Sequence, residues 1–160
     1  MKFFDINWIE GSLSNTECEL RKQKYYEHIK VILESSNLIL SMLIKNVNLH
    51  DAVMINYIEK EKEIIITFCG GDNQKGYFLL DLSYYIHSSY NKSFFNKLPT
   101  IILYDEYEYL NDKKMYLHSF INSHKKEMQI MFSHIDFSIK NTDWNMYKRY
   151  SLDINKTYTK

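Results

Sequence analysis

The sequence contains few of the residues that interrupt or cross-link a chain. Its 160 residues include one proline, four glycines and two cysteines, Cys18 and Cys69. This scarcity of proline and glycine, together with 45% hydrophobic residues, excludes a disordered or low-complexity chain. Two cysteines without a Cys-x-x-Cys spacing exclude a zinc knuckle and a thioredoxin-like redox site. A chain of this length builds one hydrophobic core without disulfides, so we expect both thiols to be reduced.

The chain also lacks a net charge and a long apolar run. Twenty lysine and arginine residues balance 20 aspartate and glutamate residues, which excludes a protein whose main role is to coat nucleic acid or an anionic membrane. The longest apolar stretch, residues 38–44, is interrupted by Ser41 and is too short to span a membrane. Asp5 interrupts the first residues, and this argues against a secretory signal. These features predict a cytoplasmic protein, with neither nucleic acid nor membrane as a partner.

Aromatic side chains are abundant, with 14 tyrosines, nine phenylalanines and two tryptophans. The accompanying richness in lysine, asparagine and isoleucine is typical of A/T-rich codon usage, which accounts for most of it. The alternative is an aromatic recognition surface, because tyrosine is enriched at protein interfaces.

The hydrophobic periodicity divides a single domain, residues 1–160, near residue 48. Residues 1–48 are predicted to be mainly helical. Ser14 and Glu17 form a capping-box pattern at the start of a long helix whose apolar residues, from Leu20 to Leu33, recur at helical spacing. A second short helix is expected over residues 38–45, with its inward side formed by Leu38, Met42 and Leu43.

Residues 49–141 change to a period of two, which predicts an antiparallel sheet. Short polar turns separate the apolar runs, so consecutive strands are expected to form a meander. Residues 84–98 are expected to be a loop with a helical turn, and the tail, residues 142–160, is aromatic and mildly basic. The predicted fold class is α+β, with N-terminal helices packed on a curved antiparallel β-meander of about six or seven strands. The expected strands lie near residues 53–57, 64–68, 77–81, 100–110, 115–121, 127–132 and 135–139.

Two short segments carry a resemblance to a known family. The chain begins Met1-Lys2-Phe3-Phe4, with Trp8 soon after, and the helix-to-sheet junction reads Leu49-His50-Asp51-Ala52. In these features the sequence resembles an uncharacterised family of small bacterial proteins, in which a Leu-His-Asp motif opens a β-meander after N-terminal helices. The resemblance implies this fold over most of the chain and brings no activity with it. Similar helix-plus-meander proteins occur among the immunity proteins of bacterial toxin systems, so the resemblance also implies an immunity-like role.

The hairpin between residues 104 and 120 has a self-consistent predicted register. A three-residue turn at 111–113 would place Tyr107 opposite Leu117 and Tyr109 opposite Met115, so that apolar residues face apolar residues in the core. A two-residue turn would pair apolar with polar positions and is disfavoured.

The same register gathers the candidate binding residues on the other face of the hairpin. Glu106 would lie opposite His118, and Glu108 opposite Tyr116. A carboxylate beside an imidazole is either an oriented general base, half of a metal site, or a solvated cross-strand pair. We interpret the face as an acidic, tyrosine-lined surface for a partner. The candidate partner-binding residues are Tyr104, Glu106, Glu108, Tyr116 and His118.

Two other pairs invite a metal-site interpretation. His50-Asp51 matches the paired ligands of one class of helical metal hydrolases, but here it opens a strand, whose neighbouring side chains point to opposite faces. Local hydrogen bonds are expected for this pair instead. His134 and Asp136 share a strand face, but no further ligand is identifiable. We therefore predict no catalytic residue, no metal and no cofactor.

The sequence predicts a non-enzymatic intracellular module that binds another protein, in its immunity-like form a bacterial toxin. An acidic row that includes Asp105 would then meet a basic partner and make association salt-dependent. The alternatives are a small metal-dependent hydrolase, using His118 with Glu106 or His50 with Asp51, and a small-molecule-binding protein; both require a pocket. A homodimer would form through a sheet edge if one is uncovered.

Overall fold

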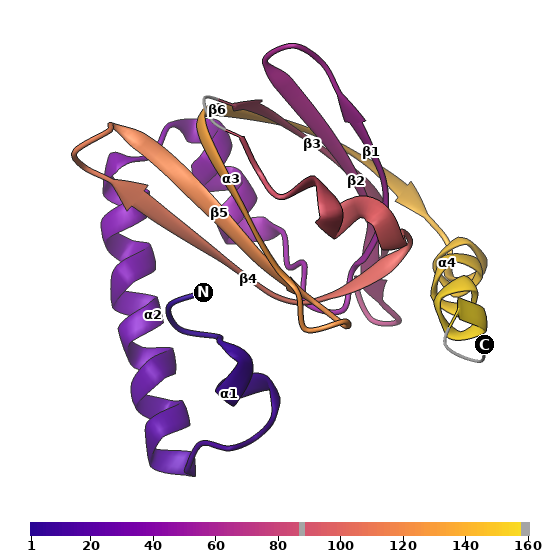
Figure 1. Cartoon of the computed structure of the whole chain (residues 1–160), viewed down its shortest axis with the longest axis horizontal. Coiled ribbons are helices and arrows are strands. Elements are labelled where there is room, and N and C mark those ends of the chain that lie inside the picture. Colours follow the sequence, from indigo (N-terminus) through magenta and orange to yellow (C-terminus); the bar gives the residue numbers. More distant parts are fainter. Residues whose placement is uncertain (87–88, 158–160) are drawn as a thin grey trace.

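The computed structural model describes residues 1–86 and 89–157. In this part of the chain, four α-helices surround a six-stranded antiparallel sheet (Figure 1). The helices are α1 (Ile6–Ile9), α2 (Asn15–Ser35), α3 (Leu38–Asn46) and α4 (Trp144–Thr157), and a 3-10 helix, η1 (Lys92–Lys97), precedes β4. The strands are β1 (Val53–Glu59), β2 (Glu63–Asp72), β3 (Gly76–Ile86), β4 (Thr100–Leu110), β5 (Met115–Asn122) and β6 (Glu127–Thr142). The predicted α+β class is confirmed.

The sheet curls into a closed barrel with the strand order β1-β2-β3-β6-β5-β4. Two three-stranded meanders, β1–β2–β3 and β4–β5–β6, join along a long β3–β6 pairing and a short β1–β4 seam. At the seam, Val53 pairs with Ile101 and Met54 with Thr100. Beyond the seam α2 flanks β4, where His28 Nε2 lies 3.0 Å from the carbonyl oxygen of Tyr107. A homodimer that forms through a free sheet edge would have to use β1 or β4. The β1–β4 pairing already takes up part of both strands, and α2 flanks β4.

Strand β6 is one strand of 16 residues where two were predicted. A bulge around residue 133 shifts its register against β3, so that Tyr85 lies opposite His134 but Ile86 lies opposite Phe132. Buried positions of β6 consequently change from even numbers, such as Phe132, to odd numbers, such as Ile135. The apolar run looks interrupted in the sequence because the strand bends, and the expected seventh strand is its continuation.

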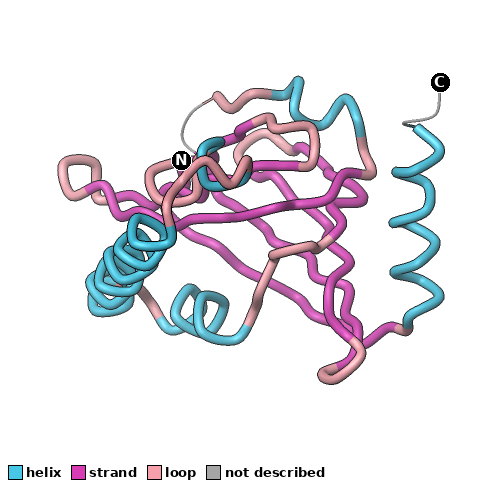
Figure 2. Tube along the Cα trace, turned by 90° about the horizontal axis from the view of Figure 1, so that it is seen from below, coloured by secondary structure: helices cyan, strands magenta, loops and turns pink. Residues whose placement is uncertain are grey.

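The helices begin where the sequence indicates. Ser14 caps α2, with the backbone N–H of Glu17 donating to its hydroxyl while the Glu17 carboxylate accepts from the Ser14 N–H at 2.9 Å. Helix α3 confirms the second short helix and buries Leu40 and Leu43. Leu38 and Met42, predicted to face inward, are instead 75% and 45% exposed, because the buried face of α3 is centred on Leu40 and Leu43. Figure 2 shows α2 and α3 well separated from α4.

The core fills the barrel and extends under α2 and α3. Burial alternates along the central strands, as expected for a barrel interior. None of the described helices is long and apolar enough to cross a membrane. The largest fully buried side chains include those of Phe68, Leu80, Tyr84, Phe120, Phe132, Ile32 and Leu40.

Two segments that the sequence left without a firm assignment acquire structure. Of residues 84–98, the first three belong to β3 and residues 92–97 form η1, which is the expected helical turn; residues 87–88 lie outside the described residues. In the tail, α4 packs its aromatic side onto the barrel, where Tyr147 contacts Tyr77 at a ring-centroid distance of 5.3 Å. Residues 158–160 of the tail lie outside the described residues.

Candidate functional site

The β4–β5 hairpin differs by one residue from its predicted register. Its turn spans four residues, 111–114, with Lys114 in a left-handed conformation (φ 53°). Tyr107 therefore lies opposite His118, and Tyr109 opposite Tyr116. A one-residue shift exchanges the faces of one strand relative to the other. The predicted single surface is wrong in this respect: one face carries Tyr104, Glu106 and Glu108, and the opposite face carries Tyr116 and His118.

Inside the barrel, three polar side chains form a buried chain of hydrogen bonds. The Tyr84 hydroxyl lies 2.8 Å from His118 Nδ1, and His118 Nε2 lies 2.9 Å from Asp105 Oδ2. A carboxylate only accepts, so Nε2 carries the proton and Nδ1 accepts from the tyrosine hydroxyl. The imidazole stacks on Tyr107 at a centroid distance of 3.8 Å. We call Tyr84, His118 and Asp105 the interior triad.

The His118 imidazole, at the centre of the interior triad, is uncharged. Desolvation lowers the pKa of His118, and this effect outweighs the Asp105 carboxylate, which raises it. Burial likewise raises the pKa of the Tyr84 phenol well above its usual value. The His118 side chain has no exposed surface, so a substrate or a metal ion has no access to it. Glu106 points to the other face, and the pairing of His118 with Glu106 required for a hydrolase does not form.

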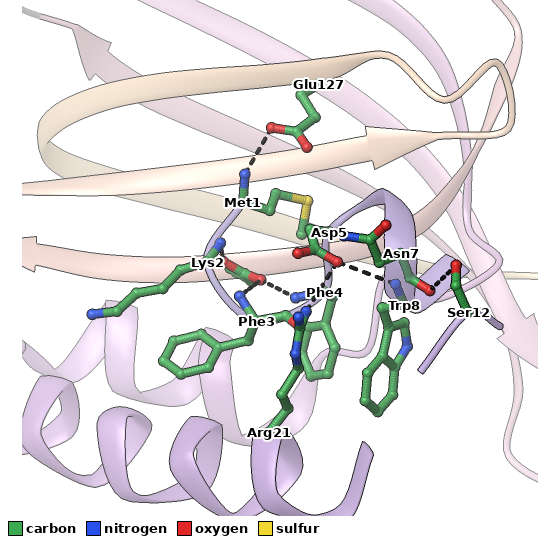
Figure 3. A network of polar contacts seen from close by, with 11 residues as sticks. Met1, Lys2, Phe3, Phe4, Asp5, Asn7, Trp8, Ser12, Arg21 and Glu127 are labelled. Carbon is green, nitrogen blue, oxygen red and sulfur yellow. Dashed lines mark hydrogen bonds and ion pairs between the residues drawn. The ribbon is translucent and has the colours of Figure 1, made fainter. Parts of the chain in front are cut away.

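On the outer face, Glu106 is buried under the N-terminal segment. The backbone N–H groups of Lys2, Phe3 and Phe4 donate to its carboxylate at 2.8, 2.7 and 2.6 Å. The segment is further held by the Met1 amino group, which lies 2.7 Å from Glu127 (Figure 3). Consecutive N–H groups that converge on one anion form a backbone nest. Glu106 is only 5% exposed, so it fixes the N-terminal segment and presents no charge to a partner.

The same segment begins α1 with a charged cap. The Asp5 carboxylate accepts from the Trp8 N–H at 3.1 Å and pairs with Arg21 of α2 at 2.9 Å (Figure 3). Desolvation raises the pKa of Asp5, but the Trp8 N–H and the Arg21 guanidinium together lower it below its usual value. Asp5 is thus ionised and ties α1 to α2.

Tyr104 joins the aromatic N-terminal segment to the helix-to-sheet junction. Its ring stacks on Phe4 at 5.0 Å, meets Trp8 edge-on at 6.1 Å and contacts His50 at 4.8 Å. The aromatic start of the chain and the Leu49–Ala52 segment therefore pack on one residue of β4. This contact gives the two motifs a structural role in attaching α1 and the helix-to-sheet junction to the barrel.

The His50-Asp51 pair lies in a turn before β1, not in the strand. Because Asp51 is left-handed (φ 62°), its carboxylate turns back to His50 Nδ1 at 3.0 Å, and both side chains are exposed. Leu49 is buried as expected. The pair borders a cleft of about 480 Å³. Across residues 1–86 and 89–157, no three His, Cys, Asp or Glu side chains are grouped to hold a metal ion.

A second exposed pair, His134 with Asp136, shares a strand face as predicted, with 3.2 Å between His134 Nε2 and Asp136 Oδ2. His134 borders a different cleft, of about 750 Å³, between the end of β3, the bulge in the middle of β6, the β1–β2 turn and residues 89–92. The two histidine–aspartate pairs are therefore separate surface features, and neither contains a residue of the interior triad.

Sequence reasoning missed an exposed apolar surface on α2 and α3. In α2, Leu20 was assigned to the inward stripe but is 49% exposed, and Val31 lies about three turns further along the same side. Isolated exposed apolar residues are ordinary, but a concentration of them indicates an interaction surface. We call this set the helical apolar surface: Leu20, Tyr26, Val31, Leu38 and Met42.

Comparisons with known proteins add no assignment: no family model, no curated protein and no solved structure matches this chain.

Proposed function

We propose that this protein acts by binding another protein, and that the helical apolar surface forms the centre of the interface. The observation that carries the proposal is that five of the nine exposed large apolar side chains in the described part of the chain lie on α2 and α3. Among them, Leu38 is 75% exposed, Tyr26 66% and Val31 63%. Tyrosine is among the residue types that supply most of the binding energy at protein interfaces, and tyrosine and methionine are both enriched there.

The surroundings of the surface indicate the chemistry of the partner. The exposed side of α2 carries positive and negative side chains next to the flank that holds Leu20 and Val31, so a mixed polar surface borders these apolar side chains. Mixed charge suits a protein surface better than a polyanion, for which one sign of charge would dominate. The charged residues are Lys24, Glu27, Lys30 and Glu34.

The acidic row expected from the sequence takes no part in this interface. Asp105 is engaged with His118 inside the barrel, and Glu106 is covered by the N-terminal segment. Binding through apolar side chains depends weakly on salt, in contrast to electrostatic steering. The association rate should therefore change little with ionic strength.

In its immunity-like form, the proposal makes the partner a bacterial toxin that this protein blocks in the cytoplasm. Cys18 and Cys69 are both free thiols, which suits a reducing compartment. The test is to co-express the chain with the product of the neighbouring gene, to score growth, and to measure complex formation by calorimetry on the purified pair. Absence of both rescue and complex would eliminate the immunity-like form.

Variants locate the interface. Val31→Lys and Leu20→Lys should each weaken a complex by more than about tenfold, because each places a charge on the side of α2 that these two apolar residues share. Ile58→Lys is the matched control, since Ile58 is 50% exposed on β1, outside α2 and α3. Equal affinities for the Val31→Lys, Ile58→Lys and unaltered proteins would overturn the assignment of the surface.

A further inference from the structure

The cleft beside His50 is lined mainly by polar side chains from separate parts of the chain. It has a volume of about 480 Å³ and lies between the end of α3, the turn before β1, the β2–β3 turn and β6. None of its residues belongs to the helical apolar surface. The side chains that matter for its chemistry are Asn48, His50, Asp51, Lys75, Tyr77 and Asn141.

The backbone holds Asp51 in a conformation that a non-glycine residue rarely adopts. At φ 62°, its N–H donates to the Ile102 carbonyl at 2.8 Å, and its own carbonyl accepts from the Tyr147 hydroxyl at 3.0 Å. Left-handed geometry is disfavoured for most residues with a side chain, and aspartate tolerates it when its carboxylate bonds locally. Glycine would adopt it readily but would lack the carboxylate that meets His50.

The Asp51 carboxylate orients the His50 imidazole. With Asp51 Oδ2 at 3.0 Å from Nδ1, the proton of the neutral ring lies on Nδ1, and Nε2 is left as an acceptor. The ring is 43% exposed and is also fixed by its edge contact with Tyr104. The pair thus presents a positioned hydrogen-bond acceptor beside the cleft.

The remaining lining matches hydroxyl groups better than anions. The Asn141 amide both donates and accepts, as a hydroxyl does, and Asn48 offers its NH2 group while its Oδ1 accepts from the His50 N–H at 3.0 Å. Of the ionised side chains that line the cleft, Asp51 and Asp72 carry two negative charges and Lys75 one positive charge, so phosphate or carboxylate ligands would be repelled. Tyr77, Phe78 and Ile139 add an apolar part of the lining, on which the C–H face of a sugar can pack.

We propose that this cleft binds an uncharged ligand with neighbouring hydroxyl groups, either a saccharide or the ribose of a nucleoside. The amides and the Asp51–His50 pair bind the hydroxyls, and the apolar part of the lining binds the carbon skeleton. This binding is independent of protein binding through α2 and α3.

The test is a titration of the ¹⁵N-labelled full chain, followed by NMR, with D-glucose, maltose, adenosine and inorganic phosphate as separate probes. We expect amide shifts that saturate and that map to residues 48–52, 71–77 and 141, with glucose or maltose if the ligand is a saccharide and with adenosine if it is a nucleoside. His50→Ala and Asn141→Ala should abolish these shifts. Both side chains are at the surface, so both variants should fold.

His134→Ala is the matched control, because His134 is also 43% exposed and also pairs with an aspartate. It should leave the titration unchanged. Three results would each overturn the proposal: no shift with any of the three hydroxyl probes, shifts with phosphate alone, or shifts that His134→Ala abolishes and His50→Ala does not.

Discussion

Replacing Glu106 with glutamine tests whether the backbone nest holds the N-terminal segment. The carboxylate accepts from Phe3 and Phe4 on one oxygen and from Lys2 on the other. Glutamine retains one side-chain oxygen and has an NH2 group in place of the other. One hydrogen bond to a charged group, worth about 1.5–3 kcal/mol, is therefore lost, and the NH2 group faces a backbone N–H that is also a donor. The two remaining bonds weaken because the acceptor is neutral. We expect the free energy of unfolding to fall by about 2–4 kcal/mol.

The assay combines urea unfolding with hydrogen exchange. In Glu106→Gln the amides of residues 2–4 should exchange faster than in the unaltered protein, because one oxygen of the acceptor is lost and the other becomes a weaker, neutral acceptor. Glu108→Gln is the control, since Glu108 lies on the same face of β4 but is partly exposed; its unfolding free energy should change by less than about 0.5 kcal/mol. Equal stabilities of the two variants, with residues 2–4 still protected, would refute the reasoning.

Three further predictions concern the barrel. Tyr84→Phe removes the hydroxyl that donates to His118 Nδ1 and leaves a buried acceptor unpaired, so urea titrations should show a loss of about 1–3 kcal/mol; an unchanged midpoint would contradict the hydrogen bond. Burial lowers the pKa of His118 in the folded state, so the unfolded chain binds a proton at this residue first as the pH falls. The free energy of unfolding should be unchanged above about pH 6.5 and should decline below it by at most about 1.4 kcal/mol per pH unit. A free energy of unfolding that rises towards acid pH would contradict this. Gly71→Ala places a Cβ 2.2 Å from the Gly76 carbonyl oxygen at φ 117°, whereas Gly11→Ala, at φ 67°, meets no atom within 4 Å; thermal unfolding should show a clearly larger loss for Gly71→Ala, and equal losses would contradict the clash.

Strand positions could be predicted because the alternation of apolar and polar residues follows directly from which side chains of a strand are buried. The runs around Ile64, Leu80 and Ile130 all lie in strands, and the capping pattern at Ser14 locates the start of α2. The closure of the barrel could not be predicted, because pairing β3 with β6 depends on contacts between distant segments. The bulge in β6 also left no local signal and made one strand look like two.

The candidate site was harder to predict, because both faces of the hairpin are largely covered and each carries ionisable as well as apolar side chains. The predicted register depended on the assumption that one face is solvated, but the N-terminal segment covers that face and supplies the N–H groups that Glu106 needs. The left-handed Lys114 that lengthens the turn has no sequence signature, unlike glycine or asparagine. A buried glutamate with partners 102 to 104 residues away looks like a surface charge in the sequence.

The strand order has a consequence for how the chain is made. Synthesis delivers the N-terminal segment, α1, α2 and α3 before β4, and the nest at Lys2 must wait for an acceptor 104 residues later. In the first meander, β3 pairs with β2 on one edge, and its other edge has no partner until β6 has left the ribosome. Phe4 has its partner Tyr104 only once β4 is made, and the inner faces of β1 to β3 are incompletely covered until β6 is made. A chain that ended before β6 would leave these apolar faces uncovered, because the barrel closes only when β6 pairs with β3 and β5.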